Sequence, residues 1–174
     1  VCPQFMREKI TLHIDKEIEE AKAGRKAQMI IKANSVSDRG LILKMYEAAE
    51  AGVVIKVIVR GIYCAINQKD FKEKIKAISI VDEYLEHARV MYFYNKGAED
   101  IYISSADWMN RNLDYRIEAA VKITQKNLKK EIKDILDIQL KDNVKTRVLD
   151  RNLSNNYVER KKNEKEIRSQ IEIF

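Results

Sequence analysis

Two apolar runs separated by one helical segment constrain the fold of this chain most. Residues 53–59 (VVIKVIV) are nearly continuous β-branched residues, as in a strand buried on both faces, and residues 28–32 (QMIIK) form a shorter apolar run. Between them, residues 40–51 carry a helical pattern. Its apolar face consists of Leu41, Ile42, Met45, Ala48 and Ala49. Strand, helix and strand in this order predict a βαβ unit with parallel strands and a right-handed crossover, and therefore the α/β class.

The rest of the chain adds helices and strands around this unit. Further helices are predicted at residues 4–23 and 126–140, with a last helix from about Glu164. Further strands are predicted at residues 75–81, 89–94, 100–104 and 114–123. The second and third of these strands form a hairpin, residues 62–74 form a polar loop, and residues 105–112 form another loop. The whole pattern predicts a mixed β-sheet flanked by helices.

Composition excludes several classes of protein. The 174 residues, 45% of them hydrophobic, can bury a core in one domain, and no apolar run approaches the length of a membrane-spanning helix. Five scattered glycines exclude the two common glycine-rich phosphate loops, and two cysteines with two histidines give no zinc spacing. This cysteine use favours a reducing compartment, so we expect a cytoplasmic protein. The chain begins with Val1, so we expect it to be a piece of a longer chain.

Positive charge is concentrated in the last third of the chain. Residues 1–121 hold 19 Lys and Arg against 18 Asp and Glu, a net charge of +1, whereas residues 122–174 hold 14 against 9, a net of +5. A basic tail suits a polyanion such as nucleic acid, polyphosphate or an anionic membrane surface. The other interpretation is a solvated helical tail with salt bridges, since charge patterns rarely identify a partner.

Arg60 is the first candidate for contact with an anion. It follows the predicted strand at residues 53–59 directly. Open α/β sheets bind ligands beyond the carboxyl ends of their strands. The alternative is an arginine in an ordinary surface salt bridge.

Of the two histidines, His87 is the stronger candidate for a functional residue. His13 lies within the first predicted helix, where we expect an ordinary surface or edge histidine. His87 lies just before a predicted strand, two residues ahead of Arg89 and 18 ahead of Ser105. This pattern resembles half of the phospholipase D-like superfamily, in which two facing histidines handle one phosphate. It departs from that pattern where Arg89 replaces a lysine and where Tyr94 and Ser104 replace an aspartate and a glycine.

Longer stretches carry a more specific resemblance. Residues 78–118 contain LEHAR and SSADWMNRNLDYR, and further matching stretches are KANSVSD at 32–38, VRGIYC at 59–64 and VKTRVLDRNLSNNYV at 144–158. Together they resemble the C-terminal region of the large, histidine-phosphorylated type of bacterial polyphosphate kinase. The resemblance covers nearly the whole chain.

This resemblance implies an architecture and a reaction. Residues 1–26 would be a helix leading in from a preceding catalytic domain, and residues 27–174 would be the second phospholipase D-like catalytic domain with its basic tail. The family transfers the terminal phosphate of ATP reversibly to polyphosphate. The transfer depends on Mg²⁺ and passes through a phosphohistidine. The phosphorylated histidine and the residues associated with Mg²⁺ belong to the preceding domain, so we expect this chain alone to be inactive and to hold no metal.

The resemblance also assigns site residues. His87 matches the histidine that faces the nucleophile, and Arg60 matches an arginine that contacts nucleotide phosphate. Arg89, Ser105, Asp107 and Arg111 are weaker candidates, for which turn hydrogen bonding or, for Arg89, orientation away from the site is the alternative. The implied partners are ATP or ADP, polyphosphate and the remaining domains of the parent enzyme, with no nucleic acid. A homo-oligomer and association with a membrane surface stay open.

Two other functions compete with this interpretation. One is a phosphodiesterase of the phospholipase D class, against which the missing lysine and aspartate argue. The other is a module that binds polyanions without catalysis, which the basic tail would allow.

Overall fold

One parallel strand pair forms the centre of the structure. The computed structural model describes residues 1–152 and 154–173. Strand β1 (Gln28–Ala33) pairs in parallel with β2 (Val54–Val59), and helix α2 (Arg39–Ala51) connects them. Asp38 caps this helix by accepting a hydrogen bond from the Leu41 N–H at 2.9 Å. The predicted parallel βαβ unit is therefore confirmed.

Five further strands complete one mixed sheet. The order is β6-β5-β4-β1-β2-β3-β7. Strand β3 (Lys76–Ile80) is parallel to β2, whereas β4 (Arg89–Phe93) is antiparallel to β1. Strands β5 (Asp100–Ser104), β6 (Ala120–Ile123) and β7 (Thr146–Val148) are all antiparallel to their neighbours. The predicted hairpin of β4 and β5 is confirmed, with the 3₁₀ turn η1 (Asn95–Gly97) between its strands.

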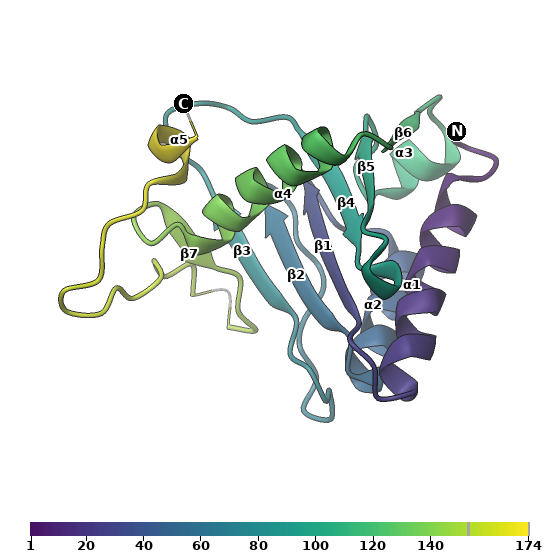
Figure 1. Ribbon diagram of the computed structural model, residues 1–174, viewed down its shortest axis with the longest axis horizontal. Coiled ribbons are helices and arrows are strands. Elements are labelled where there is room, and N and C mark those ends of the chain that lie inside the picture. Colours follow the sequence, from purple (N-terminus) through teal and green to yellow (C-terminus); the bar gives the residue numbers. More distant parts are fainter. Residues whose placement is uncertain (153, 174) are drawn as a thin grey trace.

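Helices cover both faces of the sheet, as Figure 1 shows. Helices α1 (Met6–Lys22) and α2 lie on one face, and α4 (Lys126–Lys141) crosses the other. Along β1, Met29 and Ile31 belong to the core cluster on the α1 and α2 side, whereas Ile30 packs in the cluster that contains Leu136 of α4. Burial on both faces explains why this strand alternates so little in polarity. None of the described helices has the length and apolar character needed to span a membrane.

Three sequence predictions were wrong in detail. Residues 114–123 are not one strand, because helix α3 (Asn110–Asp114) and a loop precede the short strand β6. Residues 105–112 are accordingly not all loop. The last helix, α5 (Ser169–Glu172), is one short turn rather than a helix from Glu164, and strand β7 was not foreseen. These elements lie at the sheet edges or the end of the chain, where pairing and packing outweigh local propensity.

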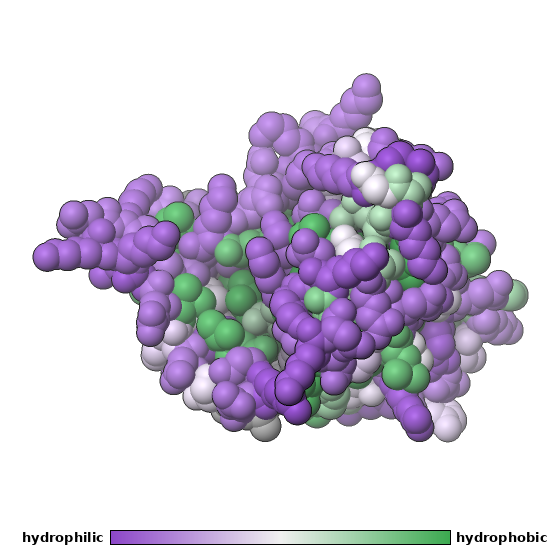
Figure 2. Space-filling model, turned by 90° about the horizontal axis from the view of Figure 1, so that it is seen from below, coloured by the Kyte–Doolittle hydropathy of each residue, from purple (hydrophilic) through white to green (hydrophobic). Residues whose placement is uncertain are grey.

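The loops at the carboxyl edge of the sheet are tied together through main-chain atoms. The Gly61 N–H, after β2, donates to the Asn34 carbonyl, after β1, at 2.8 Å. The Trp108 N–H, after β5, donates to the Ser35 carbonyl at 3.1 Å. This edge points upward in Figure 1, and Figure 2 views the molecule from the opposite end, where hydrophilic side chains cover most of the surface.

Gly61 should not accept a side chain. A Cβ atom at this position would lie 2.8 Å from the Asn34 carbonyl oxygen and 3.1 Å from Ser35 Oγ. Gly61→Ala should therefore push the two loops apart and lower the free energy of unfolding by about 1–3 kcal/mol. Gly40→Ala is the matched control, because a Cβ there comes no nearer than 3.4 Å to any atom. Equal denaturant midpoints for the two variants would contradict this close approach.

Candidate functional site

The candidate site lies where three strands meet the carboxyl edge of the sheet. Asn34 follows β1 and Arg60 follows β2. Because β4 runs antiparallel to β1, its first residue, Arg89, lies at the same edge. His87 is two residues before it, in the connection between β3 and β4. The sheet topology therefore gathers these four residues at one place.

Arg60 and His87 are in contact. The Arg60 Nε–H donates to Asn34 Oδ1 at 2.7 Å, and Arg60 Nη2 lies 3.3 Å from His87 Nδ1. Since a guanidinium has only donors, His87 Nδ1 accepts in this contact, and a neutral ring then carries its proton on Nε2. The His87 side chain is exposed, so that proton is accessible from solvent. The two residues that sequence reasoning placed first thus face one another.

Arg89 and Asp107 form a second pair beside the first. Arg89 donates through Nε and Nη2 to the two Asp107 oxygens, each at 3.2 Å, and through Nη1 to the His87 carbonyl at 3.0 Å. Asp107 Oδ1 also accepts from the Asn34 N–H at 2.8 Å. Burial favours a raised pKa for Asp107, but the hydrogen bonds from Arg89 and the main chain outweigh it and lower the pKa. The Asp107 carboxylate therefore links the Arg89 side chain to the main chain of Asn34, and most of the Arg89 donors are occupied.

Ser105 and Arg111 do not join this cluster through any described side-chain contact. Ser105 Oγ donates to the Glu118 carboxylate and accepts from the Ala119 N–H at 3.1 Å. These bonds tie the loop after β5 to the start of β6, as expected for turn hydrogen bonding. Arg111 is an exposed residue of α3 with no side-chain hydrogen bond or ion pair to another described residue.

Beneath the site lies a buried polar network that the sequence did not reveal. Lys32 Nζ pairs with the Glu86 carboxylate and donates to Gln139 Oε1 at 2.8 Å. Burial lowers the pKa of Lys32 against the opposing pull of Glu86. Burial favours a raised pKa for Glu86, but Lys32, Gln170 and Gln139 outweigh it, so the net shift is downward. A lysine inside an apolar strand was the one available sign that a buried partner exists.

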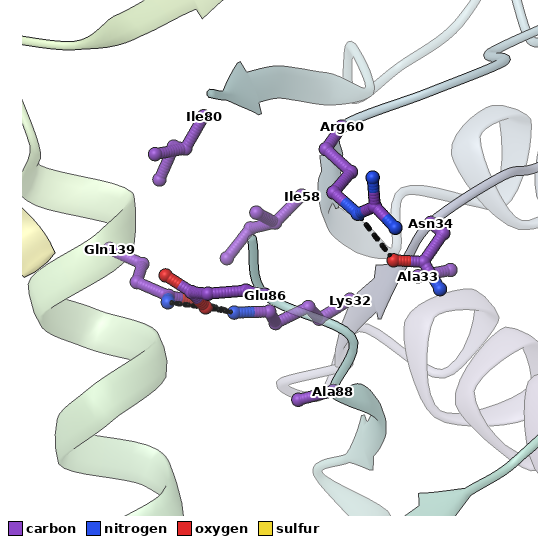
Figure 3. Close-up of a pocket in the computed structure, with 9 residues that line it drawn as sticks. All are labelled: Lys32, Ala33, Asn34, Ile58, Arg60, Ile80, Glu86, Ala88 and Gln139. Atoms are coloured by element: carbon purple, nitrogen blue, oxygen red, sulfur yellow. Dashed lines mark hydrogen bonds and ion pairs between the residues drawn. The ribbon is translucent and has the colours of Figure 1, made fainter. Parts of the chain in front are cut away.

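Lys32, Glu86 and Gln139 of this network line a narrow cavity together with Arg60 and Asn34. The cavity holds about 20 Å³, enough for about one water molecule. Figure 3 shows Arg60 and Asn34 on one side of it, with Glu86 between Gln139 and Lys32 on the other. The cavity is too small to hold a nucleotide.

His13 lies elsewhere and is half-buried at the edge between α1 and the sheet. It packs between α1 and the sheet, with its ring stacked on Phe93 at 4.9 Å and its Nε2 atom 2.9 Å from the Tyr102 hydroxyl oxygen. Burial lowers the pKa of His13, although Asp100 opposes the shift. The helical spacing that suggested an exposed face did not show that β5 lies against it.

The described residues do not fit a resident metal ion. Within residues 1–152 and 154–173, no group of three or more His, Cys, Asp or Glu side chains is placed to hold one. The two carboxylates nearest the site, Glu86 and Asp107, are each engaged by a cationic side chain.

Comparison with known proteins identifies close relatives over the whole chain. The family described as polyphosphate kinase C-terminal domain 2 matches residues 1–170. The polyphosphate kinases of Vibrio vulnificus and Escherichia coli are 46% and 43% identical to this chain over its full length. The chain spans about a quarter of the length of these relatives, 25% in each case.

Solved structures agree on the fold. A crystal structure of polyphosphate kinase from Porphyromonas gingivalis matches this chain with a TM-score of 0.92 and 45% sequence identity. The match covers 97% of this chain and 26% of the Porphyromonas gingivalis chain. Nuc from Salmonella typhimurium, a phospholipase D family member, shares the fold over 77% of this chain and 88% of its own, with a TM-score of 0.55 and 11% identity. The predicted phospholipase D-like fold is thereby confirmed. By its sequence, its structure and its match to a single family domain, the chain belongs to the polyphosphate kinase family.

Proposed function

We propose that this chain is one of two facing catalytic domains in a polyphosphate kinase that reversibly transfers the terminal phosphate of ATP to polyphosphate. Residues 1–26 then lead in from the preceding catalytic domain, and residues 27–174 form the second. One observation carries the proposal: Arg60 Nη2 lies 3.3 Å from His87 Nδ1 at the carboxyl edge of the sheet. A fixed cation beside a histidine suits phosphoryl transfer, which depends mainly on positioning and charge stabilisation.

Each of the two residues has a defined task in this proposal. Arg60 is held through Nε on Asn34, and its Nη groups can turn from His87 to the oxygens of a bound phosphate. When Arg60 turns to the phosphate, His87 Nδ1 is free to take up a proton, and the imidazolium can then donate from Nε2 to the departing oxygen and take that proton back in the reverse reaction. Arg89 fixes the His87 main chain and Asp107 fixes Arg89, so these two residues position the site rather than bind substrate.

The group that receives the phosphate lies outside this chain. The sequence holds only His13 and His87, and His13 lies within α1 with its ring stacked on Phe93, away from Arg60. In the reaction implied by the resemblance, a histidine of the preceding domain attacks the γ-phosphorus. The N–P bond forms as the bond to the β,γ-bridging oxygen breaks and ADP leaves. An oxygen of polyphosphate then attacks the same phosphorus and releases the histidine.

Several properties of the parent enzyme belong to the same proposal. The resemblance places the Mg²⁺ that accompanies the reaction in the preceding domain, outside this chain. The partners are ATP or ADP, polyphosphate and the other domains, in a cytoplasmic enzyme that does not bind nucleic acid. The basic charge of residues 122–174 suits polyphosphate, which is itself a polyanion.

The isolated chain should not synthesise polyphosphate. It lacks a second histidine in a matching motif to carry the phosphoryl group, since His13 lies in helix α1 and its Nε2 atom contacts Tyr102. The test is an assay of the purified 174-residue chain with ATP, Mg²⁺ and a polyphosphate primer, beside the full-length enzyme. Turnover by the chain alone would place the nucleophile within it and disprove the division of roles. Binding of polyphosphate with no effect of this domain on catalysis in the full-length enzyme would favour a non-catalytic module.

Arg60→Ala in the full-length enzyme should weaken the use of ATP much more than it weakens folding. Loss of charge-assisted contacts to phosphate should lower kcat/KM by roughly tenfold to a few hundredfold. Arg25→Ala is a matched control, because Arg25 precedes β1 at the opposite edge of the sheet and binds Glu20 there. If both variants keep wild-type kinetics, Arg60 is a structural residue only.

His87→Ala should lose most activity but still accept a phosphate on the other domain. Loss of a general acid costs about 10²–10⁴-fold in rate. After incubation with ATP that carries a radioactive γ-phosphate, the full-length variant should still acquire an acid-labile label, more slowly than the wild type. Mass spectrometry that locates the label on His87 in the wild type would reverse the roles of the two histidines.

A further inference from the structure

The segment that carries His87 has no regular structure of its own. Residues 81–88 connect β3 to β4 without forming a helix or a strand. Figure 1 shows this connection passing beside α5, at the end of the described chain. Between residues 81–83 or 85–88 and the other described residues, there is no main-chain to main-chain hydrogen bond outside the helices and strands. Side chains from other elements contribute the contacts that hold the segment.

Gln170 of α5 supplies the most complete of these contacts. Its Oε1 accepts from the Tyr84 N–H at 2.8 Å, and its Nε2 donates to the Tyr84 carbonyl at 2.8 Å. The same Nε2 donates to Glu86 Oε1 at 3.1 Å. The residue is 2% exposed, so these bonds are not shared with bulk solvent. The Gln170 amide thus binds both the N–H and the C=O of Tyr84. It also binds the side chain of Glu86, the residue before His87.

Glu86 is gripped from two other directions. Its second oxygen accepts from Gln139 Nε2 of α4 at 2.7 Å and pairs with Lys32 of β1. The sheet, α4 and α5 therefore converge on the side chain next to His87. A carboxylate held by three donors from three elements has little freedom to move.

The residues around Gln170 are anchored in turn. The Ser169 N–H donates to Asp142 Oδ2 at 2.7 Å, and Asp142 Oδ1 accepts from three main-chain N–H groups just after α4. Arg168 donates to both oxygens of Asp82, at 2.9 and 2.7 Å. Residues 168–170, which we call the C-terminal clamp, are fixed to the end of α4 and bind residues 82–86.

The geometry points to Gln170 as a positioning residue that, together with Glu86, holds His87 in place for phosphoryl transfer. This inference rests on the proposed function, because it assigns the clamp to the step in which His87 takes part. Arg60 is fixed independently, through Asn34 on β1. Loss of the clamp should therefore impair the proton-transfer step and leave the phosphate contact of ATP intact.

The test uses full-length polyphosphate kinase that contains this chain, with Gln170→Met as the main variant. Methionine keeps the volume of the side chain but removes all three hydrogen bonds. We expect kcat to fall by about 10–100-fold, because small misplacements of a catalytic group have effects of this size. The KM for ATP should change by less than about twofold, since ground-state binding is retained. Ile171→Ala, at the next and 55% exposed position of α5, should behave as the wild type.

A second readout does not depend on activity. Hydrogen–deuterium exchange at the main-chain amides of residues 82–88 should speed up in Gln170→Met and not in Ile171→Ala. Glu86→Gln, which leaves α5 unaltered, should also lower kcat more than it raises KM. If Gln170→Met fails to fold, Glu86→Gln alone decides the kinetic result.

The outcomes separate the two proposals. An active wild type, with Gln170→Met equal to Ile171→Ala in kcat and in exchange, overturns the clamp. An equal loss in kcat and in ATP affinity also overturns it, because it would show general destabilisation. A wild type without transfer between ATP and polyphosphate overturns the proposed function instead, and exchange at residues 82–88 still tests whether Gln170 holds the segment.

Discussion

The parallel pairing of β1 with β2 is the constraint on which the site depends. The register places Ala33 opposite Val59, so that Asn34 and Arg60 leave the sheet side by side. Their side chains then bond at 2.7 Å without any long loop to order. Since both strands are buried on both faces, a shift of register would move apolar side chains out of two core clusters at once. Burial of the strands thus fixes the position at which Arg60 leaves the sheet.

Charged groups around this pair are paired rather than free. Lys32 with Glu86 and Arg89 with Asp107 lie below and beside the site, and each pair gathers further hydrogen bonds. Buried ion pairs contribute little net stability, because desolvation offsets much of their attraction. Breaking one partner nevertheless leaves a costly unpaired charge, so such pairs hold their main chains in one arrangement. Here the main chains held are those of Asn34 and of the residues around His87.

The sequence allowed part of this arrangement to be predicted and not the rest. The apolar run at residues 53–59 was enough to predict β2, and the position of Arg60 at its end followed from the α/β rule. Contacts between distant residues were inaccessible: the pairing of Gln170 with Tyr84 spans 86 residues, and nothing in the local sequence indicates it. The partial burial of His13 could not be predicted for the same reason, because it depends on contacts with Phe93 of β4 and Tyr102 of β5. Strand β7 was not predicted, because the alternation over three residues is too short to distinguish an edge strand from a loop. The roles of His87 and Arg60 came from family resemblance and remain predictions, although the structure brings the two residues together.

The main-chain bonds between the loops at the carboxyl edge have a consequence for how such a domain changes over evolution. The contacts from Gly61 to Asn34 and from Trp108 to Ser35 use only main-chain N–H and C=O groups, so apart from the close approach that requires glycine at position 61 they do not depend on the side chain present. Side chains that project from these loops, such as the exposed Ile62, can therefore be exchanged without loosening the frame. The side chains that project from these loops can therefore vary while the main-chain hydrogen bonds between the loops stay the same. Such a domain can thus change these projecting side chains while the main-chain frame around Arg60 keeps its geometry.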